Sequence, residues 1–102
     1  MANIQNIELR RLRHVIEVGS AGSISVAAGS LGISQPALSR SIALLEHQIG
    51  IQLFERIRRG TRLTDEGELF VAEAKKIIGN VEDLISNSED YHSKKRGRLI
   101  TY

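Results

Sequence analysis

Gln35, Ser39 and Arg40 are the side chains whose types and spacing best suit reading the edges of base pairs. A glutamine can bond an adenine edge through two hydrogen bonds, and an arginine can reach a guanine or a phosphate. Pro36 and Ala43 fall on the same side of a helix, where each could contact a thymine methyl group. Such residues also form ordinary solvated helix faces. The neighbouring elements of the sequence are therefore needed to distinguish a DNA-reading face from an ordinary surface.

These side chains need a helix to present them, and residues 35–49 have the pattern of one. Ser34 suits an N-cap, Pro36 falls in a first helical turn, where its missing N–H costs nothing, and Gly50 follows the last apolar residue. The apolar stripe recurs at spacings of four, three and four residues, at Leu38, Ile42, Leu45 and Ile49. At 100° per residue this stripe lies opposite the polar face, so we expect it to enter the core.

A shorter helix precedes this one. Ser23 suits its N-cap, and Gly32 ends it after about two turns, just past Leu31. Ala27 and Ala28 allow its backbone to approach the next helix closely. Two helices joined in this way form a helix-turn-helix, whose second helix lies in a DNA major groove with its N-terminus leading. Similar helical hairpins also occur in proteins that bind no DNA.

The flanking segments predict another helix and a hairpin. Residues 7–18 carry an apolar stripe at helical spacing, and we expect Gly19 to end that helix in the left-handed conformation. Residues 51–57 and 61–63 are β-prone and flank a turn at residues 58–60. The arginines of this hairpin could follow a nucleic-acid backbone or enter a minor groove: Arg56, Arg58, Arg59 and Arg62.

The last predicted helix is longer than the elements that could cover it. Thr64 suits its N-cap, acids fill its first turn, and the pattern holds to Asp90, about 40 Å at 1.5 Å per residue. Its apolar seam consists of Phe70, Ala74, Ile77, Ile78, Val81, Leu84 and Ile85. Because three short helices cannot cover this seam, we expect it to pair two copies of the chain, above all from Ile77 onwards.

Composition narrows the chemistry. The 102 residues are 41% hydrophobic and 25% charged, as in ordinary soluble domains, and contain no cysteine, which excludes disulfides and thiolate chemistry. No apolar run could span a membrane, and no secretory signal is expected. The net charge is only +2, yet residues 52–64 hold four arginines against one glutamate, and residues 65–90 hold eight acids against two lysines. Such a basic block suits a polyanionic partner.

Several motifs occur in one order along the chain. The stretch GSISVAAGSLGISQPALSRSIALLEHQIGIQLFER covers residues 22–56, and RLTDEG covers residues 62–67. The SQPALSR core, the single LE pair, LFER and LT-x-x-G are together specific, and they resemble the DNA-binding domain of LysR-type transcriptional regulators. The resemblance covers nearly the whole chain. It implies a mainly α fold, a winged helix-turn-helix of three helices and a two-stranded hairpin wing, followed by a long dimerising linker helix.

The resemblance also implies roles for individual residues. Base reading falls on Gln35, Pro36, Ser39 and Arg40, the last at or near the backbone. Contacts to phosphates and the backbone fall by resemblance on Ser25, Ser34, Arg56 and Arg59. The positions of the residues themselves add Ser23 at a helix N-terminus, and Arg58 and Arg62 in the hairpin, to this set. Val26, Gly29 and Ser30 stand where many relatives carry long polar or basic side chains, which argues against side-chain contacts from the first helix of the pair.

By this resemblance, residues 1–64 form the DNA-binding domain, 65–92 the linker helix, and 93–102 a basic hinge leading to an effector-binding domain outside this chain. Residues 97–100 look like the start of that domain. The implied function is sequence-specific binding of duplex DNA by a bacterial, cytoplasmic, nucleoid-associated homodimer at an interrupted inverted repeat. The full-length protein would respond to a small-molecule inducer and could form tetramers. No cofactor, metal or membrane partner is expected.

Three alternatives remain. A winged helix of another class, such as the molybdate-responsive regulators, would share the dimerising helices, but the SQPALSR core argues against it. A helical module that binds a protein would use the long seam equally well and leave the hairpin arginines without a purpose. An enzyme has least support, because His14, His47 and His92 lie on three different segments and no phosphate-binding glycine loop is present.

Overall fold

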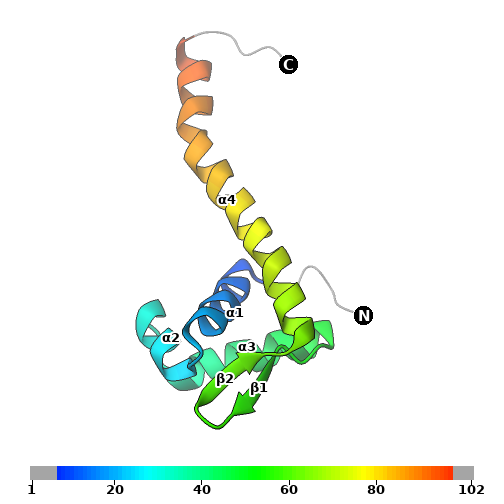
Figure 1. The fold of residues 1–102 in the computed structure, drawn as a ribbon. Helices are drawn as coiled ribbons and strands as arrows, with labels where there is room; N and C mark the ends of the chain where they lie inside the picture. The colour runs from blue at the N-terminus through cyan, green and yellow to red at the C-terminus, as the bar shows by residue number, and fades with distance from the viewer. Residues whose placement is uncertain (1–6, 98–102) are drawn as a thin grey trace.

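The computed structural model describes residues 7–97 of the chain, with the backbone alone for residues 92–97. Its elements are α1 (Leu9–Ala21), α2 (Ile24–Leu31), α3 (Gln35–Ile49), β1 (Phe54–Ile57), β2 (Gly60–Leu63) and α4 (Asp65–Gly97). In Figure 1, α1, α2, α3 and the hairpin gather at one end of the molecule, and α4 extends away from them. The winged helix-turn-helix with a long following helix is therefore confirmed.

The helices begin where the capping residues predict. The backbone N–H three residues further on donates to the side-chain oxygen of Ser23, Ser34 and Thr64, at 3.2, 3.2 and 2.9 Å. Each bond satisfies one of the four N–H groups that a helix N-terminus leaves without an internal partner. The entry points of α2, α3 and α4 are thus fixed by local chemistry.

The predicted end of α1 is wrong by three residues. The helix continues through Gly19 to Ala21, and Gly22 takes the left-handed conformation with φ of 69°. Gly19 has another use, since a Cβ atom there would lie 3.0 Å from Leu63 Cδ1. The small residue inside the helix therefore lets β2 pack against α1.

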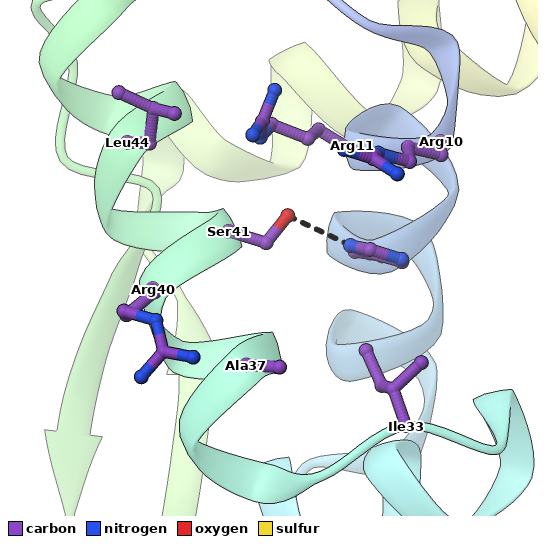
Figure 2. Close-up of a pocket in the computed structure, with 8 residues that line it drawn as sticks. Arg10, Arg11, Ile33, Ala37, Arg40, Ser41 and Leu44 are labelled. Carbon is purple, nitrogen blue, oxygen red and sulfur yellow. Dashed lines mark hydrogen bonds between the residues drawn. The ribbon is translucent and has the colours of Figure 1, made fainter.

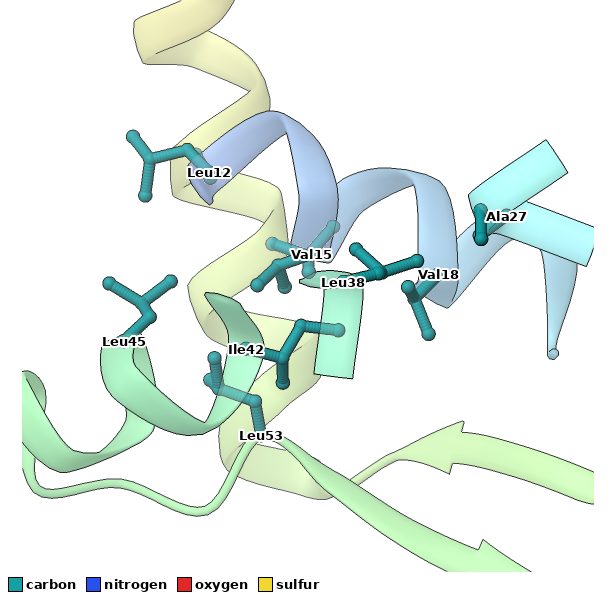
Figure 3. Close-up of a cluster of buried hydrophobic side chains, with 11 residues drawn as sticks. Leu12, Val15, Val18, Ala27, Leu38, Ile42, Leu45 and Leu53 are labelled. Atoms are coloured by element: carbon teal, nitrogen blue, oxygen red, sulfur yellow. The ribbon is translucent and has the colours of Figure 1, made fainter. Parts of the chain in front are cut away.

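One hydrophobic core joins all four helices. Its largest fully buried side chains are Val15 and Val18 of α1, Leu38 and Leu45 of α3, and Leu53, which precedes β1. Figure 3 shows these side chains converging between the helices, with Ala27 of α2 on the side of Val18. Val71 and Ala74, from the first turns of α4, also belong to the core. The start of α4 is therefore packed into the same core as α1, α2 and α3.

The hairpin is shorter than predicted. Phe54 pairs with Leu63 and Ile57 with Gly60 in antiparallel register, so residues 51–53 lie outside the strand and residues 58 and 59 alone form the turn. The Thr61 backbone N–H donates to the Gly22 carbonyl at 3.1 Å. This bond docks the hairpin on the connection between α1 and α2.

The helix α4 has 33 residues and ends at Gly97, beyond the Asp90 at which the sequence pattern stops. Residues 93–97 are thus helical where a linker was expected, and residues 98–102 of the predicted hinge lie outside the described part of the chain. None of the helices within residues 7–97 has the length and apolar character needed to cross a membrane.

Candidate nucleic-acid interface

The outer face of α3 carries the residues expected to read bases. Gln35, Pro36, Ser39 and Arg40 are all exposed, as is Ala43. The opposite face of the same helix is buried through Leu38, Ile42 and Leu45. Helical periodicity thus separates a packing face from a free face, and the free face begins at the helix N-terminus. Among the described residues, Arg40 has no carboxylate partner, so its guanidinium group is available to an external anion.

The N-termini of α2 and α3 supply backbone donors beside this face. The hydroxyl oxygens of Ser23 and Ser34 each accept a hydrogen bond from their own helix, which leaves each O–H free to donate. Ser25 and Ser34 are exposed, and Ser23 is half-buried. A phosphate placed here would meet unpaired N–H groups and the positive end of the helix dipole.

The hairpin divides the four wing arginines. Glu55 lies opposite Arg62 in the ladder, and Arg62 Nε donates to Glu55 Oε2 at 3.0 Å. Because side chains alternate across a strand, Arg56 falls on the other face. Arg56, Arg58 and Arg59 are exposed and have no carboxylate partner in the described part of the chain. Arg62 is therefore the least available of the four for an outside anion.

The carboxylate of Glu46 joins α3 to the wing. The sequence pattern did not predict this role. Glu46 Oε2 accepts from the backbone N–H of Leu53 at 2.7 Å and of Phe54 at 3.3 Å. Thr64 Oγ1 donates to the Gln52 carbonyl at 2.7 Å, and the Thr64 N–H donates to the Leu53 carbonyl at 2.9 Å. The base of the hairpin is thereby held between α3 and α4. The Leu45-Glu46 pair of the sequence motif was the available signal.

Close packing at this junction explains one glycine of the LT-x-x-G motif. A Cβ atom on Gly67 would lie 2.1 Å from the Leu53 carbonyl oxygen and 3.1 Å from Leu63 Cδ2. Because the nearer atom belongs to the backbone, only a large shift could make room for a side chain. Gly67 therefore lets α4 start directly against the base of the wing.

His14 is half-buried between α1 and α3, and Figure 2 shows its bond to Ser41. Nδ1 of His14 lies 2.7 Å from Ser41 Oγ. Burial lowers the pKa of His14 below its ordinary value of 6.5, and the nearby Arg10 and Arg11 lower it further. The ring is thus a neutral packing and hydrogen-bonding group, and nothing in its surroundings poises it as a catalytic base.

The seam of α4 meets two environments. Ala74 is buried, and Phe70 and Ile78 are half-buried against the core. Ile77, Leu84 and Ile85 are 45%, 60% and 65% exposed. Val81 lies between these extremes. Of the seven residues expected to pair two copies, the structure thus uses the first ones for packing within the chain and leaves the later ones on the surface.

Comparison with known proteins decides between the families considered. The model for the bacterial regulatory helix-turn-helix protein, lysR family, matches residues 9–68. The chain belongs to the LysR family. An uncharacterised HTH-type transcriptional regulator of Escherichia coli, YnfL, is 40% identical over 94 residues, which are 92% of this chain and 32% of the relative. BenM of Acinetobacter baylyi, also an HTH-type transcriptional regulator, is 44% identical over 80 residues, 78% of this chain and 26% of BenM.

Solved structures of LysR-family domains with DNA have the same fold. The BenM DNA-binding domain in complex with catB site 1 DNA is 41% identical, with a TM-score of 0.81 over 85% of this chain and 94% of that one. The CbnR DNA-binding domain in complex with DNA is 34% identical, with a TM-score of 0.80 over 84% of this chain and 99% of that one. This chain is therefore a LysR-type DNA-binding domain. It spans about a third of the length of the curated relatives it matches.

Proposed function

We propose that this chain binds duplex DNA sequence-specifically as a homodimer, with α3 in the major groove and the wing on the flanking backbone or minor groove. The observation that carries the proposal is the free outer face of α3, where Gln35, Ser39 and Arg40 are exposed at the N-terminal end of a helix whose other face is fully packed. Gln35 and Arg40 supply donors for base edges, and Pro36 supplies an apolar contact. Its likeness to two DNA-bound LysR domains supports this placement.

The homodimer is proposed to form through the distal half of α4. Ile77 lies seven residues before Leu84 and eight before Ile85, about two helical turns, and all three are at least 45% exposed. Isolated apolar side chains are common on surfaces, but a repeated apolar stripe that the described chain leaves exposed suits a second helix. Two paired copies would place two α3 helices for an interrupted inverted repeat. In the full-length regulator, an inducer-binding domain would follow in a cytoplasmic dimer or tetramer.

Selection of bound duplexes from a random DNA library, at about physiological salt, tests the proposal. Enrichment of an interrupted palindrome is the expected result, because it requires both base reading and two copies. Enrichment of a single half-site would refute pairing through α4 while preserving base reading. Retention with no enriched motif would refute base reading by α3. No retention of a folded sample would reject DNA binding and favour a protein partner instead.

A further inference from the structure

A cleft of about 470 Å³ runs between α1 and α3, beside the face of α3 described above. Its polar lining consists of Arg10, Arg11, His14, Arg40 and Ser41. Figure 2 shows the α1 arginines on one wall and Arg40, Ser41 and Leu44 on the other, with Ile33 near one end. Among residues 7–97, no carboxylate lines the cleft. Its chemistry is therefore that of a site for an anion.

The positive charge of this cleft is only partly balanced within the chain. Arg10 and Arg11 both pair with the same carboxylate, that of Glu8. Arg40 has no carboxylate partner among the described residues. Three guanidinium groups thus face one carboxylate, and the Nε of Arg11 is buried without a hydrogen-bond partner. An oxygen anion entering the cleft would restore the charge balance and supply acceptors to these donors.

The position of Arg40 indicates which anion. Arg40 lines the cleft and also stands on the exposed outer face of α3. A DNA strand bordering the groove occupied by α3 would therefore pass the mouth of the cleft. We propose that the α1–α3 cleft binds a backbone phosphodiester of the DNA, held by Arg10 and Arg40, so that the interface includes α1. The inference rests on the proposed function and adds a contact from α1 to those of α3 and the wing.

Arg10→Gln is the direct test, and Arg13→Gln is its matched control. Both arginines lie on α1 with side chains that are 68% and 56% exposed, and each makes one ion pair, to Glu8 and Glu82 respectively. Of these two arginines, only Arg10 lines the cleft. The two substitutions thus remove the same charge from the same helix. Any difference between them reports the cleft and not the net charge.

Affinity for a selected duplex and for a scrambled duplex would be measured between 50 and 200 mM salt. Arg10→Gln should weaken both complexes alike and reduce the salt slope by about 0.9 for each bound copy, or about 1.8 for the proposed dimer. The loss of affinity over this fourfold range of salt then becomes about twelvefold smaller. Arg10→Lys should keep the slope, because a phosphate accepts a point charge. Equal behaviour of Arg10→Gln and Arg13→Gln would overturn the cleft assignment. Absence of salt-dependent binding by the wild-type chain would instead overturn the proposed function.

A second measurement separates a DNA phosphate from a free one. Inorganic phosphate would be titrated into the DNA-free chain while the ring resonances of His14 are followed by NMR. A parallel titration adds inorganic phosphate to the DNA complexes of the wild type and of Arg10→Gln at constant ionic strength. Displacement of DNA from the wild type but not from Arg10→Gln would support a site shared with the duplex. A phosphate-dependent shift of the His14 ring, with equal DNA affinities for Arg10→Gln and Arg13→Gln, would make the cleft a free-anion site and overturn the proposal.

Discussion

The helices α3 and α4 carry similar apolar stripes but end in different surroundings. In α3 the stripe is covered by the chain itself, and Leu38 and Leu45 are fully buried. In α4 the cover stops after the first turns, since Ala74 is buried and Ile85 is 65% exposed. The comparison teaches that periodicity identifies the packing face of a helix but not its partner. The face offered to the outside is the polar one in α3 and the apolar one in α4.

The largest effect should separate the two halves of α4. Ala74→Asp would place a carboxylate in the core without a partner, and we expect it to lower the free energy of unfolding by about 3–5 kcal/mol. Ile85→Asp should leave the unfolding of the monomer within about 0.5 kcal/mol of wild type, because the side chain is already exposed. Urea denaturation measures the stability of both variants. Ile85→Asp should also abolish the proposed dimer, and sedimentation measures that loss.

If Ile85→Asp unfolded the protein as strongly as Ala74→Asp, the distal stripe would have to be covered within the chain. If both variants kept the oligomeric state of the wild type, pairing through α4 would be excluded. Either result would remove the contrast between the two helices.

The attachment of α3 to the wing should give the next largest effect. Glu46→Ala leaves the N–H groups of Leu53 and Phe54 without their acceptor, and we expect a loss of about 1–3 kcal/mol in unfolding free energy. Glu46→Gln keeps an acceptor oxygen and should lose less. Denaturant titration of the three proteins checks the order. Equal loss in both variants would show that the negative charge, and not the acceptor, matters.

The outer face of α3 should affect binding and leave folding unchanged. Gln35→Ala should reduce discrimination at one base pair of each half-site by about 1–3 kcal/mol, whereas Arg59→Ala should weaken all sequences alike and reduce the salt slope by about one unit for each bound copy. Competition binding with single-substituted duplexes at two salt concentrations distinguishes the two. Identical profiles for both variants would end the division of roles between α3 and the wing.

The smallest effect concerns His14, which joins α3 to α1. Its pKa is lowered in the folded chain, so the unfolded chain takes up the proton first as the pH falls below 6.5. Above pH 6.5 this residue contributes no pH dependence, and below it the stability decreases until His14 is protonated in the folded state as well. His14→Gln should remove that part of the decrease. Denaturation of both proteins at pH 7.5 and pH 5.5 compares them.

The sequence predicts those features of this fold that depend on neighbouring residues. The caps at Ser23 and Ser34 and the inward stripe of α3 are local, and the structure has them as expected. The end of α1 is different, because Gly19 and Gly22 both suit a helix end locally, and the close approach of Gly19 to Leu63, 44 residues away, is not visible in the local pattern. In the same way, the bond of Arg62 to Glu55 depends on a strand register that no local pattern specifies.

In the candidate site, too, the sequence predicts the local features and misses those that depend on distant contacts. Residue types and helical angles place Gln35, Ser39 and Arg40 together on one face. The contribution of Glu46 depends on where the chain returns seven residues later, and the cleft beside Arg40 depends on how α1 crosses α3. The seam of α4 was one pattern in the sequence. Its division at about Ile77 follows from where the core ends.

The hydrogen bonds around Thr64 couple the orientation of α4 to the wing and to α3. Thr64 fixes the first turn of α4 to the base of the wing, and Glu46 fixes that base to α3. Over 33 residues α4 is about 50 Å long, so a tilt of roughly 5° at its base moves its far end by about 4 Å. That displacement exceeds the 3.4 Å step between base pairs. In the proposed homodimer, the angle at which α4 leaves the domain would therefore set the separation between the two α3 helices and so between the half-sites.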